Sequence, residues 1–249
     1  MARPTELARL LADVARGAFP PPDGTVAFVP QPSLRDAGVI AFTAHSVVFA
    51  DVDAGPDDRE DTGVALRELL PAGDLSAPLN PPFLSALTAR TGRQVNNIDV
   101  LAVAGPLPGP PPGPALVETN DRSHPRIVRA LRHRDGVRAW TVPGATLLLG
   151  RGVAGRWEAA VEVEPRARGR GLGRSLAVAA RHLVPDGAPV WAQIAPGNAA
   201  SLRAFLAAGF TPVGAEALLL PAPDPLPPDP YPYPYPYPQA PPAADRNGA

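Results

Sequence analysis

Residues 156–174 read RWEAAVEVEPRARGRGLGR, an alternating segment followed directly by one rich in glycine and arginine. The alternation predicts a β-strand over residues 156–163, because successive strand residues point to opposite faces. One face would carry Trp157, Ala159, Val161 and Val163, and the other Glu158, Ala160 and Glu162. The glycines that follow lack the Cβ atoms that would hold a ligand away from the backbone, and the first N–H groups of a helix after them can bind an anion. The stretch therefore predicts a strand, an anion-binding turn and a helix in succession.

The segments around this stretch alternate between helix and strand patterns. The expected elements are, in order, a helix over 124–134, strands over 137–142 and 145–149 joined by a Pro-Gly turn, the strand and helix above, a strand over 190–195, a helix over 199–208 and a last strand pair from Phe210. Asn198 is placed to cap the last helix and Gly209 to end it. This order predicts an α/β (α+β) domain.

Two short motifs in this part of the chain resemble the GNAT superfamily of N-acetyltransferases. Arg168-Gly-Arg-Gly-Leu-Gly173 fits the family pattern [Gln/Arg]-x-x-Gly-x-[Gly/Ala]. Asn198-Ala-Ala-Ser201, with Gly209-Phe210 at the end of the same helix, resembles the second family signature. Asn198 follows Arg168 by 30 residues, which leaves room for one helix and one strand, as in the family. The resemblance covers residues 122–221 and nothing before them.

The resemblance implies a mixed central sheet flanked by helices, with acetyl-CoA as co-substrate. In the family, the strand before the first motif and the strand after its helix splay apart, and the pantetheine arm lies in the opening. The implied pyrophosphate residues are Arg168, Gly169, Arg170, Gly171, Leu172, Gly173 and Arg174. The backbone near Val163 would meet the acetyl carbonyl, while Asn198 and Ser201 would line the pantetheine side.

The residues that would move protons depart from the family pattern. Some members place a glutamate five residues before the asparagine and a tyrosine seven residues after it, where this chain has Gln193 and Phe205. Glu162 is the candidate base, although it alternates onto the face opposite Trp157 and Ala159 and would need a bulge to reach the substrate. Deprotonation through water is an equal alternative, and Glu158 and Glu162 could instead lie on a solvated strand face or pair with Arg151 or Arg156.

Composition excludes several other classes of chemistry. The chain has no cysteine and no lysine, so thiolate zinc sites, thiol nucleophiles, Schiff bases and P-loops are closed to it. Its four histidines lack metal-ligand spacing, and we expect no metal. A formal charge of −1 argues against general binding to nucleic acid or anionic membranes, and no apolar run is long enough to span a bilayer. We expect a cytoplasmic protein.

Proline marks the expected domain organisation. The chain has 36 prolines, and they are densest in two segments. One is 105–114, which reads GPLPGPPPGP, and the other begins beyond residue 221 and contains a Tyr-Pro repeat. The sequence predicts a smaller N-terminal α/β unit of unknown role over 1–104, a linker over 105–114, the GNAT-type domain over 115–221 and a disordered tail over 222–249. In the N-terminal unit we expect helices over 5–16, 64–70 and 83–90, and strands over 25–29, 39–51 (broken near His45) and 98–104.

Three functions are compatible with the sequence. The first is an acetyl-CoA-dependent N-acyltransferase that acts by direct transfer on an amine, in a small molecule or a peptide. The second is a catalytically weak GNAT-fold module that binds CoA, suggested by Gln193 and Phe205. The third is an arginine-rich RNA contact, which the charge balance and the lack of interleaved aromatic residues disfavour. The sequence leaves the acceptor and the oligomeric state open.

Overall fold

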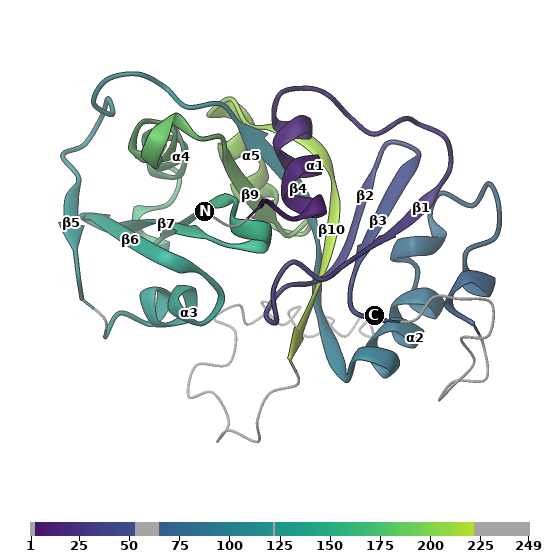
Figure 1. The fold of residues 1–249 in the computed structure, drawn as a ribbon. Coiled ribbons are helices and arrows are strands. Elements are labelled where there is room, and N and C mark those ends of the chain that lie inside the picture. Colours follow the sequence, from purple (N-terminus) through teal and green to yellow (C-terminus); the bar gives the residue numbers. More distant parts are fainter. Residues whose placement is uncertain (1–2, 53–64, 122, 222–249) are drawn as a thin grey trace, which may run out of the picture.

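The computed structural model describes residues 3–52, 65–121 and 123–221 (Figure 1). The predicted disordered tail, 222–249, lies outside the described residues. The helices are α1 Glu6–Ala15, α2 Pro81–Thr91, α3 Pro125–His133, α4 Leu172–Leu183 and α5 Ala199–Ala207. The strands are β1 Val26–Val29, β2 Ala37–Phe42, β3 His45–Phe49, β4 Arg93–Ala104, β5 Val117–Thr119, β6 Asp135–Val142, β7 Ala145–Arg151, β8 Trp157–Val163, β9 Val190–Ile194 and β10 Thr211–Pro221. Most of the expected helices and strands are thus present, with shifts in their ends.

Two local expectations need correction. The expected helix over 64–70 is only a short 3-10 turn, Leu66–Leu69, and Val64 lies outside the described residues. The expected last strand pair is the single strand β10, whose neighbours are β2 and β4. Strand β5 was not anticipated, since three residues carry too little alternation to identify a strand.

The described strands form one mixed sheet in the order β1-β3-β2-β10-β4-β9-β8-β7-β6-β5. Strand β4 precedes the predicted linker, yet it pairs antiparallel with both β9 and β10. Leu101 and Ala102, on opposite faces of β4, are fully buried, as expected of a central strand. The sheet therefore runs across the predicted boundary at 105–114, because the last strand of the N-terminal segment fills a position inside the C-terminal half.

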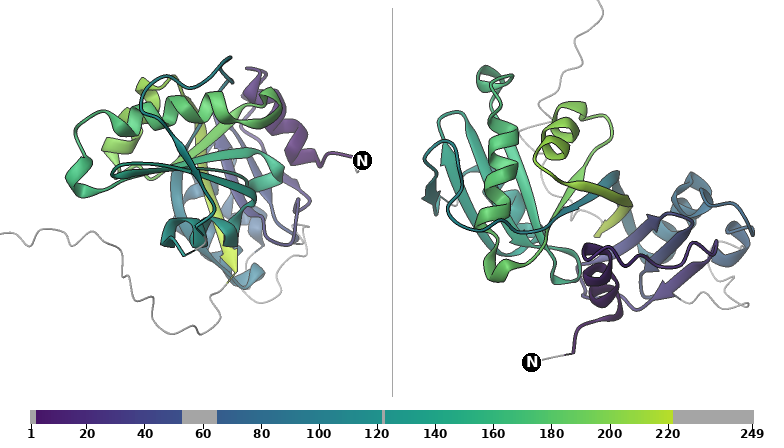
Figure 2. Two further views of the ribbon diagram at one scale, coloured as in Figure 1. Left: turned by 90° about the vertical axis from the view of Figure 1, so that its left-hand side faces the viewer. Right: turned by 90° about the horizontal axis from the view of Figure 1, so that it is seen from above.

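Helices cover both faces of this sheet, so the fold has three layers (Figure 2). On one face, α4 and α5 cover the strands from β4 to β7, and α2 covers the strands around β2 and β10. On the other face, α1 packs near β2, β4 and β9, whereas α3 packs on β6 and β7. Figure 1 shows α4 and α3 on opposite sides of the strands β6 and β7. The site described below lies where β8 and β9 meet between these layers.

The proline-rich segment 105–114 contains neither helix nor strand, as predicted. It is fixed along the C-terminal half of α4 by three hydrogen bonds. The Leu107 N–H donates to the Arg181 carbonyl at 2.8 Å, Arg181 Nε donates to the Gly105 carbonyl at 2.9 Å, and His182 Nδ1 lies 3.0 Å from the Gly109 carbonyl. The segment therefore holds β4 and α4 together rather than separating two bodies.

Candidate functional site

Strands β8 and β9 are parallel but stay paired only at their first residues. Trp157 pairs with Val190 and Glu158 with Trp191, and no pair follows. Along its other edge β8 pairs with β7 over its whole length. The two strands therefore diverge toward their C-terminal ends, as the resemblance implied. The open edges are residues 159–163 of β8 and 192–194 of β9.

The backbone of β8 presents hydrogen-bonding groups to this opening. The Glu164 N–H donates to the Gly144 carbonyl at 2.9 Å, so it points toward β7. The Val163 carbonyl instead accepts from Arg168 Nε at 3.2 Å, on the opposite edge. Because the N–H and C=O of one strand residue point to the same edge and alternate along the strand, the N–H groups of Val161 and Val163 also face the opening. These groups can donate to a carbonyl oxygen placed between the strands.

Helix α4 begins at the same end of β8. Gly171 is its N-cap, with φ of 81°, and no side chain caps the helix. The first helical hydrogen bond runs from the Ser175 N–H to the Gly171 carbonyl at 3.0 Å. The N–H groups of Leu172, Gly173 and Arg174 precede it and have no partner within the helix. They leave an uncapped helix end at the place where the sequence predicted an anion-binding turn, and the positive φ at Gly171 explains the glycine there.

The predicted pyrophosphate residues come together around this helix end. Gly169 also has a positive φ, of 74°, so the turn bends through two left-handed glycines. Arg168, Arg170 and Arg174 are exposed on the turn. Arg170 and Arg174 make no hydrogen bond or ion pair with the described residues, so their guanidinium groups are available to an anion.

Gly173 faces the gap between β8 and α5. An added Cβ would lie 3.8 Å from Val163 Cγ2 and 3.6 Å from Ala204 Cβ, which are ordinary contacts. Packing alone therefore tolerates alanine at this position, and only a larger side chain would enter the gap.

The second motif lies across the opening, at the end of β9. Asn198 is the N-cap of α5, and its Oδ1 accepts from the Ser201 N–H at 3.1 Å. Asn198 Nδ2 makes no hydrogen bond with the described residues. The structure thus brings the two motifs to the two walls of one opening, although their roles toward CoA stay predictions.

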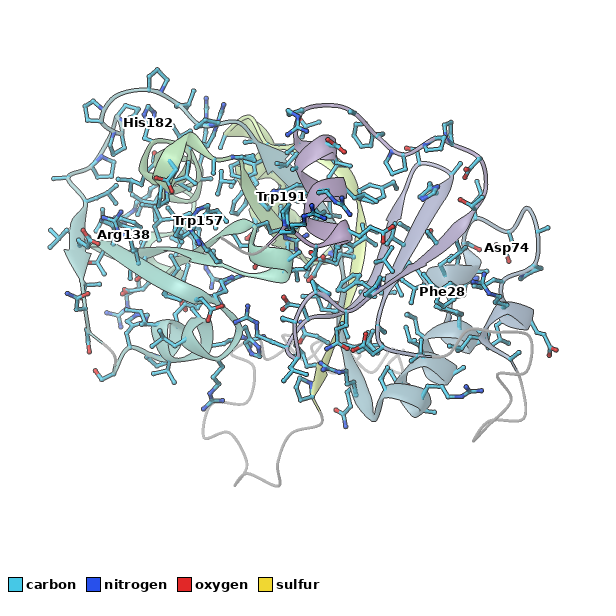
Figure 3. All side chains as sticks on the ribbon, in the orientation of Figure 1. Phe28, Asp74, Arg138, Trp157, His182 and Trp191 are labelled. Carbon is cyan, nitrogen blue, oxygen red and sulfur yellow. The ribbon has the colours of Figure 1, made fainter. Side chains whose placement is uncertain are left out.

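The residues considered for proton transfer have different surroundings. Glu162 lies on the face of α3, with its side chain 48% exposed and 3.6 Å from Arg126 Nε. It pairs with neither Arg151 nor Arg156, and its role as base stays a prediction. Phe205 is buried and meets Phe210 edge to face at 4.9 Å, so it is a core residue. Trp157 and Trp191 are also buried, beneath α4 and beside α1 respectively (Figure 3).

A buried ionic network, of which the sequence suggested only the pair of Glu158 with Arg156, lies on the face of α1 and α3 beside the opening. Arg156 donates to Glu158 Oε1 at 2.9 Å and to Glu216 Oε2 at 2.7 Å. Arg134 donates to Glu158 Oε2 at 2.8 Å, and Gln193 Nε2 donates to Glu216 Oε2 at 2.6 Å. The exposed fractions of Arg156, Glu158 and Glu216 are 8%, 3% and 1%. The network ties the start of β8 to β9 and β10.

The electrostatics of this network favour the charged forms of Glu158 and Arg156. Burial opposes ionisation of Glu158, but Arg156 and Arg134 outweigh it, so the pKa of this carboxyl is lowered. Burial likewise opposes the charge on Arg156, and Glu216 and Glu158 raise its pKa above the ordinary value. Within the described residues, Glu216 Oε1 and Arg156 Nη1 are buried and have no hydrogen-bond partner.

Asp99 stands at the edge of the same network. It lies on β4 directly opposite Glu216 of β10, is partly exposed and accepts from Asn97 Nδ2 at 2.8 Å. Burial raises the pKa of Asp99 and the charge on Glu216 raises it further, against the lowering effects of Asn97 and Arg129. Local sequence patterns give no signal for this pair, because β4 and β10 are distant in the chain.

The described residues contain neither a membrane-spanning helix nor a cluster of metal ligands. None of the helices there is long and apolar enough to cross a bilayer. Nor does any group of three or more His, Cys, Asp or Glu side chains in those ranges have the arrangement to hold a metal ion.

No protein-family model matches the sequence, and no curated protein is significantly similar to it. Among solved structures, the chain is similar to a GCN5-related N-acetyltransferase from Kribbella flavida, with 20% identity and a TM-score of 0.39 over 57% of this chain and 65% of the other. It is also similar to a putative acetyltransferase of the GNAT family from Novosphingobium aromaticivorans DSM 12444, with 20% identity and a TM-score of 0.38 over 52% of this chain and 67% of the other. The match thus spans less than two thirds of the Kribbella protein. The C-terminal half has a mixed sheet, two diverging strands and a glycine-rich helix start, which are features that the resemblance to the GNAT superfamily implied.

Proposed function

We propose that this protein is an N-acyltransferase that moves the acetyl group of acetyl-CoA directly to an amine. The observation that carries the proposal is the uncapped N-terminus of α4, ringed by exposed arginines, at the end of β8 where β8 and β9 have diverged. An anion-binding helix end beside an open pair of strand edges fits a ligand with a pyrophosphate and a long uncharged arm.

The residues present fit the parts of acetyl-CoA one by one. The N–H groups of Leu172, Gly173 and Arg174, with the side chains of Arg168, Arg170 and Arg174, would hold the pyrophosphate. The pantetheine arm would lie between β8 and β9, beside Asn198 and Ser201 of α5. The N–H groups of Val161 and Val163 face this opening and would polarise the acetyl carbonyl. Acetyl-CoA itself supplies the activated thioester.

The reaction that this arrangement supports is direct transfer. The nitrogen of a neutral amine forms a bond to the thioester carbon, and the electron pair of the carbonyl moves onto its oxygen. The intermediate then collapses, the C–S bond breaks and CoA leaves as the thiolate. After the attack the nitrogen carries one proton more than the amide does, and the leaving thiolate can take this proton. The products are an amide and CoA.

The second candidate, a module that binds CoA without efficient turnover, rests on one specific observation. Gln193 and Phe205 occupy the positions at which some family members have a general base and a general acid. Phe205 is buried against Phe210 and cannot transfer a proton. Turnover separates the two candidates, whereas binding of acetyl-CoA does not.

The test of the proposal combines thiol release with charge variants. The full chain should release CoA from acetyl-CoA only when an amine is added, measured with a thiol reagent. Arg170→Ala and Arg174→Ala should each weaken acetyl-CoA affinity about tenfold or more, since each removes one charge-assisted contact. Arg9→Ala is the matched control, because Arg9 is an exposed arginine on α1. Equal effects of all three variants would contradict the assigned site.

A further inference from the structure

Asp99 is an acidic residue beside the buried network that none of the described arginines contacts, so no direct ion pair compensates its charge. In the buried network, Arg134 and Arg156 are matched by Glu158 and Glu216. Asp99 forms no ion pair with the described residues, and its hydrogen-bond donor is the neutral Asn97. Arg129 of α3 acts on it only through space and is exposed to solvent. Asp99 therefore adds a net negative charge at the edge of the network.

The sheet register places Asp99 at the diverging end of β8 and β9. Val100 of β4 pairs with Ile194, the last residue of β9, so Asp99 lies level with the end of that strand. Along β4, Asp99 alternates with Val100 and so shares a face with Leu101, which is buried on the α1 side. Gln193, opposite Leu101, is on this face as well. The carboxyl thus lies on the far side of the sheet from α4, one strand away from the opening.

Glu216, the cross-strand neighbour of Asp99, has a buried carboxylate oxygen without a hydrogen-bond donor among the described residues. The two carboxyl-bearing residues are direct cross-strand neighbours, which puts their Cβ atoms about 4.5–5.5 Å apart. Glu216 Oε2 is used by Arg156 and Gln193, but its buried Oε1 accepts no hydrogen bond from the described residues. A buried carboxylate oxygen without a donor is costly, so a proton donor is expected there. A positively charged ligand, or a proton held by Asp99, would supply it.

We propose that Asp99 is the general base of the acyl transfer and that Asp99 with Glu216 selects a positively charged primary amine as acceptor. This inference rests on the proposed function. The ammonium group enters from the face of α1 and α3 and transfers one proton to the Asp99 carboxylate, directly or through one water. The neutral nitrogen then attacks the thioester carbon in the opening, the C–S bond breaks, and the leaving CoA thiolate takes the extra proton that the nitrogen still carries. Asp99 returns its proton to solvent.

Charged groups around Asp99 favour this exchange. Glu216, from β10, disfavours a second negative charge and so stabilises the protonated form of Asp99, which makes it a better proton acceptor. Arg129, from α3, acts in the opposite direction, and Arg156 and Gln193 hold Glu216 in place from the start of β8 and from β9. The carboxylate that Gln193 lacks is thereby supplied from neighbouring strands.

The test compares Asp99→Asn with wild type in thiol release from acetyl-CoA. The acceptors are ethylamine and 1,4-diaminobutane, whose amino groups are protonated at neutral pH, and hydroxylamine, which is neutral there. Asp99→Asn should bind acetyl-CoA as wild type does but lose about a hundredfold in kcat/KM with the two cationic amines. The loss with hydroxylamine should be smaller, because that nucleophile needs no deprotonation before attack. Asp13→Asn, an exposed aspartate on α1, is the matched control and should change neither value.

The pH profile separates a base from a structural residue. In wild type, kcat/KM should rise with pH as Asp99 ionises, at a pH above the ordinary aspartate range, and Asp99→Asn should remove this rise. An unchanged profile in Asp99→Asn, or its loss in Glu162→Gln instead, would overturn the inference and leave the proposed function standing. Failure of wild type to bind acetyl-CoA would overturn both. If wild type binds acetyl-CoA but releases no CoA with any of the three amines, the assignment of Asp99 as general base is overturned and the binding module is favoured.

Discussion

Replacing Arg156 with methionine tests whether the buried network holds the start of β8 to the rest of the sheet. Arg156 is the link between two buried carboxylates, and the exposed fraction of its side chain is 4%. After the change, Glu158 keeps Arg134 at 2.8 Å and the Val153 N–H at 3.3 Å. Glu216 keeps only Gln193, at 2.6 Å. Removal of Arg156 therefore affects Glu216 more than Glu158, because Glu216 loses its one arginine partner among the described residues.

Breaking a buried ion pair from one side costs about 3–5 kcal/mol, because a charge is left in a poorly solvated place. We expect Arg156→Met to lower the free energy of unfolding by about 4 kcal/mol, in the middle of that range, since two carboxylates lose a partner but each keeps another hydrogen-bond donor. In urea denaturation this corresponds to a shift of the midpoint by more than about 1 M, for a slope of about 2–3 kcal/mol per molar.

Two further variants make the result specific. Arg156→Met combined with Glu216→Gln should recover about 1–2 kcal/mol, because the second change removes the charge that the first left unpaired. Arg16→Met breaks the exposed pair with Asp13 on α1 and should cost about 0–1 kcal/mol. If Arg156→Met costs no more than Arg16→Met, the network is solvated and the reasoning about its burial is wrong.

Other predictions follow from the same geometry. Gly171→Val should remove acetyl-CoA binding in calorimetry and cost about 1–2 kcal/mol of stability, since valine strains at a φ of 81°; full affinity would show that the helix end does not hold the ligand. Gly173→Ala, by contrast, should leave the melting temperature nearly unchanged, because the added methyl group meets only ordinary contacts; a loss of several degrees would mean that the α4–α5 gap is tighter than described. The lowered pKa of Glu158 stabilises the fold above the ordinary glutamate pKa, and this stability should be lost as the pH falls below about 4; Glu158→Gln should flatten that acid limb in thermal denaturation.

Much of the C-terminal half could be predicted because its signals are local. Residues 156–163, which form β8, alternate in sequence, and the glycines at 169 and 171 have the positive φ that only glycine adopts easily. Asn198 caps α5 and Gly209 ends it with a φ of 85°, as the residue types suggested. These features each depend on a few consecutive residues, so the sequence alone contains them.

The remainder depends on pairing between distant segments. The strand expected at 98–104 was present, but nothing in its own residues identified β9 and β10 as its neighbours. The position of β4 between β9 and β10 brings Asp99 beside Glu216. Similarly, Glu158 was expected to face solvent or one arginine, whereas Arg134 and Arg156 together bury it. Side chains whose partners come from other strands cannot be assigned from spacing.

Calorimetric titration of the full chain with acetyl-CoA, and with ATP in parallel, tests the central claim most directly. A site made of the α4 helix end and the β8–β9 opening should bind acetyl-CoA at one site per chain and ATP at least about tenfold more weakly, because ATP offers phosphates but no pantetheine arm. Acetyl-CoA at about a hundred times its dissociation constant should also stabilise the fold by about 2.7 kcal/mol. Absence of acetyl-CoA binding at millimolar concentration, or equal affinity for ATP, would contradict the acyltransferase assignment.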